Sequence, residues 1–323
     1  MRPVRGFALA VCCAVAAMAG TAEAQPYPNR PVRMVIAFPP GGTSDVVGRV
    51  VSAKLADFLG QPIIIDNRPG AAGAIGAQAV ANAAPDGYTL LMASSDLTIV
   101  PASHAKAPYD AAKDFAPVGT VLDYSHVLVA NPNVPAKDAK ELIALAKAAP
   151  GKLNFASGGS GGSNHLSGEW FKRSAGVDLT HVPYKGNGPA ITDLLADRVQ
   201  LLFTSTGPVE GFLKSGKLKA IAVTGRTRIP SMPDVQTVAE NALPRYEFSL
   251  WYGVVAPAGT PAAVVERLNA DLRRTMASPE VAEKLASIGG NLSVSSPQEF
   301  GALIREELVR WTKLAREVGI KAE

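Results

Sequence analysis

A glycine-rich turn near the start of the chain carries groups suited to binding an anion. It lies between an apolar run at 32–38 and valines and leucines that recur at helical spacing, and it reads Phe38-Pro39-Pro40-Gly41-Gly42-Thr43-Ser44-Asp45. Glycines let backbone N–H groups approach a ligand without a Cβ in the way. The first turn of a helix leaves N–H donors free and carries positive partial charge. The pattern therefore predicts either a site for a small carboxylate or phosphate, or a helix capped by Thr43, Ser44 or Asp45.

A second glycine-rich turn begins another α/β block. It joins a predicted strand at 153–156 to a predicted helix at 163–175, and it reads Ser157-Gly158-Gly159-Ser160-Gly161-Gly162-Ser163. In open α/β sheets, ligands bind outside the carboxyl ends of the strands. Two such turns that face each other across a cleft would hold an anion from both sides.

The second turn also matches the G-x-S-x-G pattern of a serine-hydrolase nucleophile elbow, with Ser160 as the nucleophile. A triad also needs a carboxylate and a histidine. In the chain order of hydrolases the acid follows the serine and the histidine comes last, and Asp178 with His181 satisfies that order. They are three residues apart at the start of a predicted strand, which is a poor arrangement for a proton relay. We therefore expect no enzyme, and an exported serine hydrolase is the alternative function.

Other site chemistries have weaker support in the sequence. The glycines at 70, 73 and 76 have G-x-x-G-x-x-G spacing, whereas a dinucleotide-binding loop needs G-x-G-x-x-G. The sequence contains neither a Walker A motif nor H-E-x-x-H, and its four histidines lack the spacing of metal ligands. The expectation is a protein without cofactor or metal.

Residues 1–24 have the features of a secretory signal peptide. Arg2 and Arg5 precede an apolar segment at 7–19, and Ala22-Glu23-Ala24 is a small-x-small cleavage site. Cleavage near Ala24 would remove the two cysteines of the chain, Cys12 and Cys13, so the mature protein would have no disulfide. No later segment is apolar enough to predict a transmembrane helix, and we expect a soluble exported product.

The charge pattern argues against nucleic acid as a partner. The chain has 32 Lys and Arg and 28 Asp and Glu, a formal net charge of +4. This excess is mild, and the basic residues are scattered along the chain instead of forming blocks.

Predicted strands and helices alternate along most of the chain. The strands are expected at 32–38, 62–66, 88–93, 127–130, 153–156, 179–182, 199–203, 219–223 and 252–256. The helices are expected at 44–59, 73–83, 139–149, 163–175, 189–196 and over most of 261–318. This alternation predicts an α/β protein with parallel sheets that carry helices on both faces.

Short segments spread over almost the whole mature length resemble one family, the Bug-type periplasmic receptors of tripartite tricarboxylate transporters. The segments are YPNRP at 27–31, FPPGGTSD at 38–45, GQP at 60–62, NRPGAAG at 67–73, PDGYTLL at 85–91, HVPYKG at 181–186 and WYGVVAPAGTP at 251–261. Their order and coverage make the resemblance specific.

The resemblance implies a two-domain periplasmic-binding-protein fold (type II-like), each domain a sheet flanked by helices, with a ligand cleft between. The first domain would comprise 26–123 plus 250–323 and the second 124–249. The implied function is a monomeric periplasmic receptor that captures a small carboxylate and delivers it to membrane permease subunits. Dicarboxylates, tricarboxylates and aromatic acids all remain open as ligands.

The resemblance also implies which residues contact the ligand. Two loops would hold its carboxylate with backbone groups, often through water. The implied loop residues are Phe38, Pro40, Gly41, Gly42, Thr43, Ser44 and Asp45, with Ser160, Gly161, Gly162 and Ser163. Ser94, Ser95, Tyr184 and Thr204 are expected to face the cleft. Many relatives have an acidic residue near Thr204, and its absence here argues against a zwitterionic amino acid.

Overall fold

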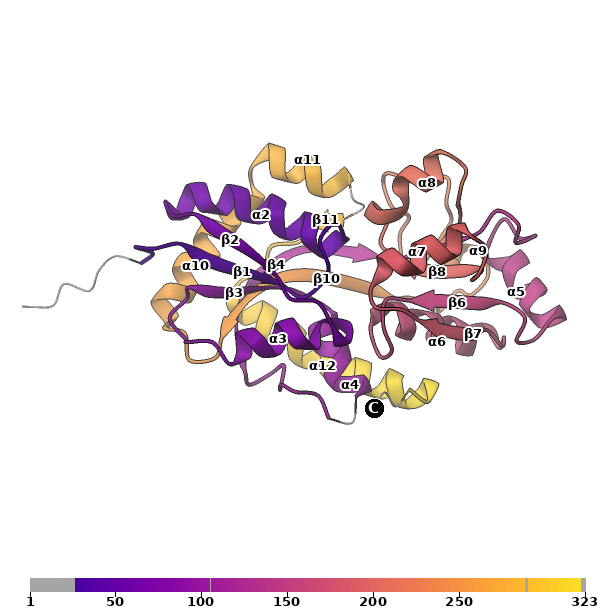
Figure 1. The fold of residues 1–323 in the computed structure, drawn as a ribbon, viewed down its shortest axis with the longest axis horizontal. Coiled ribbons are helices and arrows are strands. Elements are labelled where there is room, and N and C mark those ends of the chain that lie inside the picture. Colours follow the sequence, from indigo (N-terminus) through magenta and orange to yellow (C-terminus); the bar gives the residue numbers. More distant parts are fainter. Residues whose placement is uncertain (1–26, 105, 288–289, 321–323) are drawn as a thin grey trace, which may run out of the picture.

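The protein has two β-sheets, each covered by helices on both faces (Figure 1). The computed structural model describes residues 27–104, 106–287 and 290–320. The predicted signal peptide and its two cysteines lie outside these residues. Within the described ranges, none of the helices is long and apolar enough to cross a membrane.

The first sheet contains six strands in the order β11-β4-β10-β3-β1-β2. Their bounds are β1 Val32–Ile36, β2 Ile63–Asn67, β3 Thr89–Ser94, β4 Phe115–Ser125, β10 Ser249–Pro257 and β11 Gly290–Leu292. β1 pairs in parallel with β2 and β3, whereas β10 is antiparallel to both β3 and β4. The prediction of parallel sheets is therefore confirmed for β1, β2 and β3 and wrong for β4, β10 and β11. β4 leads the chain into the second sheet and β10 brings it back, so the two neighbours run in opposite directions.

The second sheet contains five strands in the order β7-β6-β8-β5-β9. Their bounds are β5 Val127–Ala130, β6 Asn154–Ser157, β7 Thr180–Pro183, β8 Leu201–Thr204 and β9 Lys219–Val223. β6 is parallel to β7 and β8, and β5 is antiparallel to β8 and β9. This sheet is mixed for the same reason, because β5 and β9 connect to the strands that cross between the sheets.

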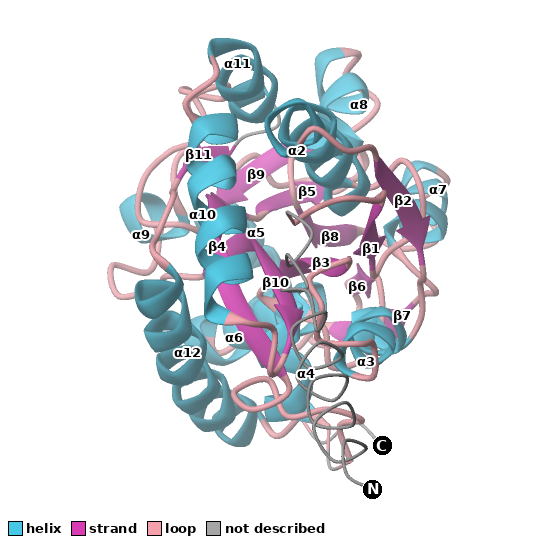
Figure 2. Cartoon of the chain, turned by 90° about the vertical axis from the view of Figure 1, so that its left-hand side faces the viewer, coloured by secondary structure: helices cyan, strands magenta, loops and turns pink. Residues whose placement is uncertain are grey.

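Helices of the first lobe lie on both faces of its sheet (Figures 1 and 2). They are α2 Thr43–Leu59, α3 Ala74–Ala81, α4 Asp96–Ser103, α10 Ala262–Met276, α11 Pro279–Ser287 and α12 Pro297–Val318, with a 3-10 turn at Ala71–Gly73. In α2 the buried residues Val47, Val51, Leu55 and Leu59 recur every four positions, which places them on the face toward β1. This packing fixes where the helix begins, at the turn after β1.

Helices of the second lobe flank the five-stranded sheet. They are α5 Ala139–Ala148, α6 Ser163–Ala175, α7 Asn187–Leu195, α8 Glu210–Lys214 and α9 Val238–Asn241, with a 3-10 turn at Gly207–Val209. α12 runs from the first lobe beneath the second, where its Trp311 packs against Phe248 with ring centroids 5.1 Å apart (Figure 1).

Two elements near the crossing between the lobes escaped the sequence analysis. β4 contains Pro117 and Gly119, which normally argue against a strand, and irregular pairing with β10 accommodates them. α4 contains Pro101. Only His126 separates the end of β4 from the start of β5.

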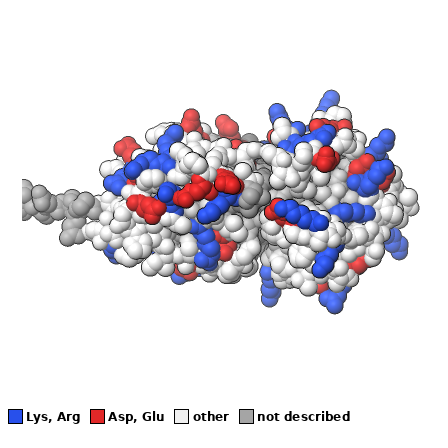
Figure 3. All heavy atoms as spheres, turned by 90° about the horizontal axis from the view of Figure 1, so that it is seen from above, with Lys and Arg blue, Asp and Glu red and all other residues white. Residues whose placement is uncertain are grey.

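Charged side chains of both signs are interspersed on the upper face of both lobes (Figure 3), as the scattered basic residues predict.

Candidate functional site

A cavity of about 240 Å³ lies between the two lobes, and the N-termini of three helices border it. α2 contributes Gly42, Thr43 and Ser44; α6 contributes Gly162, Ser163 and Asn164; α7 contributes Gly186, Asn187 and Gly188. Phe38, Pro39, Pro40 and Gly41 complete the wall at α2. The convergence of three helix ends makes the cavity favourable for negative charge.

The first predicted turn lies on the cavity wall and has free backbone donors. The N-cap of α2 is Gly42, and no side chain caps the helix. Among the described residues, no acceptor is hydrogen-bonded to the backbone N–H groups of Thr43 and Ser44. A ligand oxygen can therefore take these donors. Of the two predictions for this turn, the simple helix cap is wrong.

Asp45 does not line the cavity but holds the turn from behind. Its carboxylate accepts hydrogen bonds from the Gly41 N–H at 3.0 Å, from Asn67 Nδ2 at 2.9 Å and from Arg49 Nε at 2.8 Å. Burial opposes ionisation of this carboxyl, yet these bonds together hold its pKa below the usual value. Gly41 has a φ of +81°, a conformation that favours glycine.

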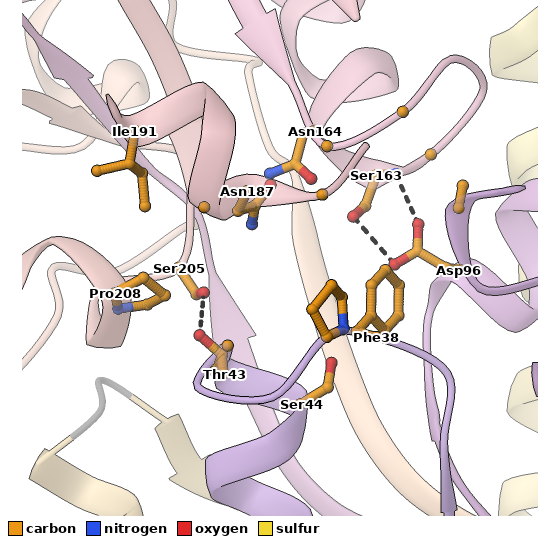
Figure 4. A pocket seen from close by; sticks show the side chains of 18 of the residues that line it. Phe38, Thr43, Ser44, Asp96, Ser163, Asn164, Asn187, Ile191, Ser205 and Pro208 are labelled. Carbon is orange, nitrogen blue, oxygen red and sulfur yellow. Dashed lines mark hydrogen bonds between the residues drawn. The ribbon is translucent and has the colours of Figure 1, made fainter. Parts of the chain in front are cut away.

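The second predicted turn meets the first lobe directly. The Asp96 carboxylate, at the start of α4, accepts hydrogen bonds from the Ser163 N–H at 2.7 Å, from Ser163 Oγ at 3.2 Å and from Ser94 Oγ at 3.1 Å (Figure 4). The N-terminus of α6 is therefore occupied by a carboxylate of the chain itself. Burial raises the pKa of Asp96, and the hydrogen bonds from Ser163 and Ser94 oppose that shift. No pattern in the sequence pointed to this residue.

Other contacts join the lobes on either side of the cavity. Thr43 Oγ1 and Ser205 Oγ are 2.5 Å apart, and Figure 4 shows this pair across the open space from Asp96 and Ser163. The Ser103 hydroxyl donates to the carbonyl of Gly161 at 2.7 Å. Hydrogen bonds between the two lobes therefore border the cavity.

The third helix end, at α7, was not predicted as part of the site. Asn187 Nδ2 donates to Thr204 Oγ1 at 3.3 Å, while its buried Oδ1 has no hydrogen-bond partner in the described part of the chain. The glycines at 186 and 188, just before a predicted helix, are the sequence signal that could have identified it.

The floor of the cavity comes from the strands that cross between the lobes. Tyr124 of β4 and Tyr252 of β10 stack with ring centroids 4.8 Å apart, and Ser44 Oγ donates to Tyr252 Oη at 3.2 Å. His126 lies beside them, and its Nδ1 lacks a partner among the described residues. Burial lowers the pKa of His126 to about 3, so its imidazole is neutral at pH 7.

Seven predicted site residues do not line the cavity: Asp45, Ser94, Ser95, Ser160, Gly161, Tyr184 and Thr204. Ser94 supports Asp96, and Ser95 Oγ accepts from the Trp251 N–H at 2.9 Å. The Tyr184 hydroxyl donates to Asp193 at 2.8 Å. Thr204 is fully buried behind Asn187. Phe38, Pro40, Gly41, Gly42, Thr43, Ser44, Gly162 and Ser163 do line it.

The hydrolase motif lacks its base in this arrangement. Ser160 is exposed, and no hydrogen bond joins its side chain to any described histidine. The serine paired with His181 is Ser157, with Oγ and Nε2 2.7 Å apart, and Ser157 is fully buried. Within the described residues, no group of three His, Cys, Asp or Glu side chains could hold a metal ion.

Comparison with known proteins decides the family. A family model described as the tripartite tricarboxylate transporter family receptor matches residues 47–320. The chain belongs to this receptor family. A curated family relative, Protein BugT of Bordetella pertussis, is 37% identical, with 97% of each chain covered.

Solved structures of the family have the same fold. The periplasmic binding protein BugD is 33% identical with a TM-score of 0.87, covering 92% of this chain and 100% of that one. The R. palustris protein Rpa4515, solved with adipate, is 34% identical with a TM-score of 0.87, covering 91% and 99%. MatC from Rhodopseudomonas palustris, with bound malate, is 33% identical with a TM-score of 0.84, covering 90% and 100%. The predicted two-domain periplasmic-binding-protein fold is confirmed.

Proposed function

We propose that the protein is a periplasmic receptor that captures a small carboxylate and delivers it to the membrane permease subunits of a tripartite tricarboxylate-type transporter. The observation that carries this proposal is the N-terminus of α2, whose Thr43 and Ser44 N–H groups are unpartnered among the described residues and border the cavity between the lobes. Similar proteins solved with adipate and malate support a carboxylate as the ligand.

The size of the cavity and its polar groups fit reversible binding of a small ligand. A volume of about 240 Å³ is below the range typical of drug-sized ligands. One contact between an anion and a helix end contributes about 0.3–1 kcal/mol, and up to about 2 kcal/mol when partly buried. Useful affinity therefore requires several donors together, with closure of the lobes around the ligand.

The two lobes would act as the two domains of a closing clamp. We assign 26–123 plus 250–323 to the first domain and 124–249 to the second. The passage from β4 to β5 around His126 and the return into β10 at Ser249 support these boundaries. A signal peptide cleaved near Ala24 would export the chain to the periplasm, where it would act as a monomer.

A glycine substitution in the first turn tests the site. Gly42 is at the N-cap of α2 with φ −80°, so a side chain there is compatible with the backbone. We expect Gly42→Val to weaken binding of a small carboxylate, assayed with hexanoate and with adipate, at least about 10-fold in calorimetry, because the added side chain crowds the free donors. Gly211→Val is the matched control, since a Cβ at Gly211 meets no atom within 4 Å and lies outside the cavity. Equal affinities of both variants and the wild type would contradict the proposal.

A further inference from the structure

Asp96 is the charged side chain on the wall of the cavity. Among the described lining residues no Lys, Arg or Glu occurs, and His126 is neutral at pH 7. Asp96 is only 7% exposed, so its carboxylate is separated from bulk solvent. A buried charge of this kind acts strongly on any other charge inside the same cavity.

The hydrogen bonds of Asp96 favour its ionised form. All of its side-chain partners are donors: the Ser163 N–H and hydroxyl and the Ser94 hydroxyl. The carboxylate also lies at two helix N-termini, its own at α4 and that of α6 across the cleft. Each helix end stabilises a negative charge.

The charge balance of the cavity then leaves only about half a positive charge for a ligand, which favours one carboxylate over two. A helix N-terminus is equivalent to about half a positive charge, so the ends of α2, α6 and α7 supply about +1.5. Asp96 cancels about two thirds of that and occupies the donors at α6. Free backbone donors remain at α2, on Thr43 and Ser44, and at α7, on Asn187 and Gly188, because none of these N–H groups has an acceptor among the described residues.

We propose that Asp96 determines ligand charge: the site takes an acid with a single carboxylate and discriminates against the matching dicarboxylate. This inference rests on the proposed function. A roughly spherical cavity of about 240 Å³ is about 8 Å across, so a second carboxylate inside it would lie within about 6–8 Å of Asp96. At an effective dielectric of about 20, repulsion at that distance corresponds to about a 30- to 100-fold loss of affinity. The rest of the ligand would meet uncharged groups, including His126, which is 2% exposed and has no partner for Nδ1 among the described residues.

Matched ligand pairs test the inference. Calorimetry would compare butyrate with succinate, hexanoate with adipate and benzoate with terephthalate. One of the three monocarboxylates will bind the wild type most tightly. We expect its affinity to be at least 10-fold higher than that of the matching dicarboxylate. Asp96→Asn, which keeps the shape and an acceptor for the Ser163 N–H, should shift that ratio 30- to 100-fold toward the dicarboxylate.

A control variant and the wild type separate the possible outcomes. Glu307→Gln removes another buried carboxylate, which lies outside the cavity between Trp251 and Trp311, and should leave the ratio unchanged. Equal or tighter binding of the dicarboxylate by the wild type would overturn the inference while leaving the proposed function intact, and this holds even if Asp96→Asn does not fold. An unchanged ratio in folded Asp96→Asn would also overturn it. Binding of none of the six acids would refute the carboxylate-receptor proposal itself.

Discussion

The carboxylate of Asp96 accepts a hydrogen bond from the backbone N–H of Ser163 at 2.7 Å, although the two residues belong to different lobes. An anion thus fills the N-terminus of α6, as the glycine-rich turn predicted, but the anion comes from the protein. Burial of this charge has consequences for stability that can be measured.

Asp96→Asn should stabilise the fold at pH 7. The folded-state pKa of Asp96 is raised by burial, so the contribution of this carboxyl to stability is fully present below its unfolded pKa of about 3.9 and is lost as the pH rises through the folded pKa. Asparagine cannot ionise and so avoids that loss. We expect the free energy of unfolding of the variant to exceed that of the wild type by an amount on the order of 1 kcal/mol at pH 7, and this difference should shrink as the pH approaches 4. Thermal unfolding at pH 7 and pH 4 measures it.

Asp45→Asn provides the comparison with the opposite sign. The folded-state pKa of Asp45 is lowered, so its contribution is present above the unfolded pKa and is lost as the pH falls through the folded value. We expect this variant to be destabilised at pH 7 by about 2 kcal/mol, because it weakens three hydrogen bonds to one carboxylate. Shifts of the same sign in both variants would contradict this account of the two carboxylates.

One buried and two half-buried histidines, His126, His165 and His181, should make the protein sensitive to mild acid. Burial lowers the pKa of His126 to about 3, of His165 to about 3 and of His181 to about 4, and the stacked rings of His165 and His181 lie 3.7 Å apart. The unfolded chain takes up protons near pH 6.5 while the folded protein does not, so the free energy of unfolding falls as the pH drops from about 6.5 toward 4. Each histidine contributes a slope of about 1.4 kcal/mol per pH unit.

His126→Phe isolates one of these contributions. Phenylalanine can keep the ring contact with Phe248, whose centroid is 5.9 Å away, but cannot bind a proton. Urea unfolding at pH 7, 6 and 5 measures the free energy of unfolding. Its slope against pH should be shallower for the variant, by about the 1.4 kcal/mol per pH unit that one histidine contributes. A slope equal to that of the wild type would show that His126 is not protected from protonation.

Gly161→Val should destabilise the protein instead of blocking ligand access. Gly161 has a φ of +74°, and a Cβ there would lie 2.3 Å from His104 Cε1 and 2.9 Å from Ser103 Oγ. We expect a loss of more than about 2 kcal/mol and disruption of the contact between Ser103 and the Gly161 carbonyl. Chemical denaturation checks this, and wild-type stability in the variant would contradict it.

The sequence by itself determined the local elements and the family. Helical spacing over 44–59 and 163–175 and the glycine turns before them are local signals, and the structure has α2 and α6 there, with bounds that differ by at most one residue. The free donors at α2 follow from the same local pattern. Neither the direction of β10 nor the existence of β4 was predicted, because Pro117 and Gly119 mask a strand that only its partners stabilise.

Tertiary structure alone decided which residues share the cavity. Thr43 meets Ser205 and Asp96 meets Ser163 across 162 and 67 positions of sequence, and no spacing rule connects residues so far apart. The contact at the α6 end could not be predicted for this reason, since the Ser163 N–H is bonded to an acidic residue from the other lobe. Periodicity and turn chemistry place a donor at the end of a helix, but the charge that reaches it depends on how two sheets pack.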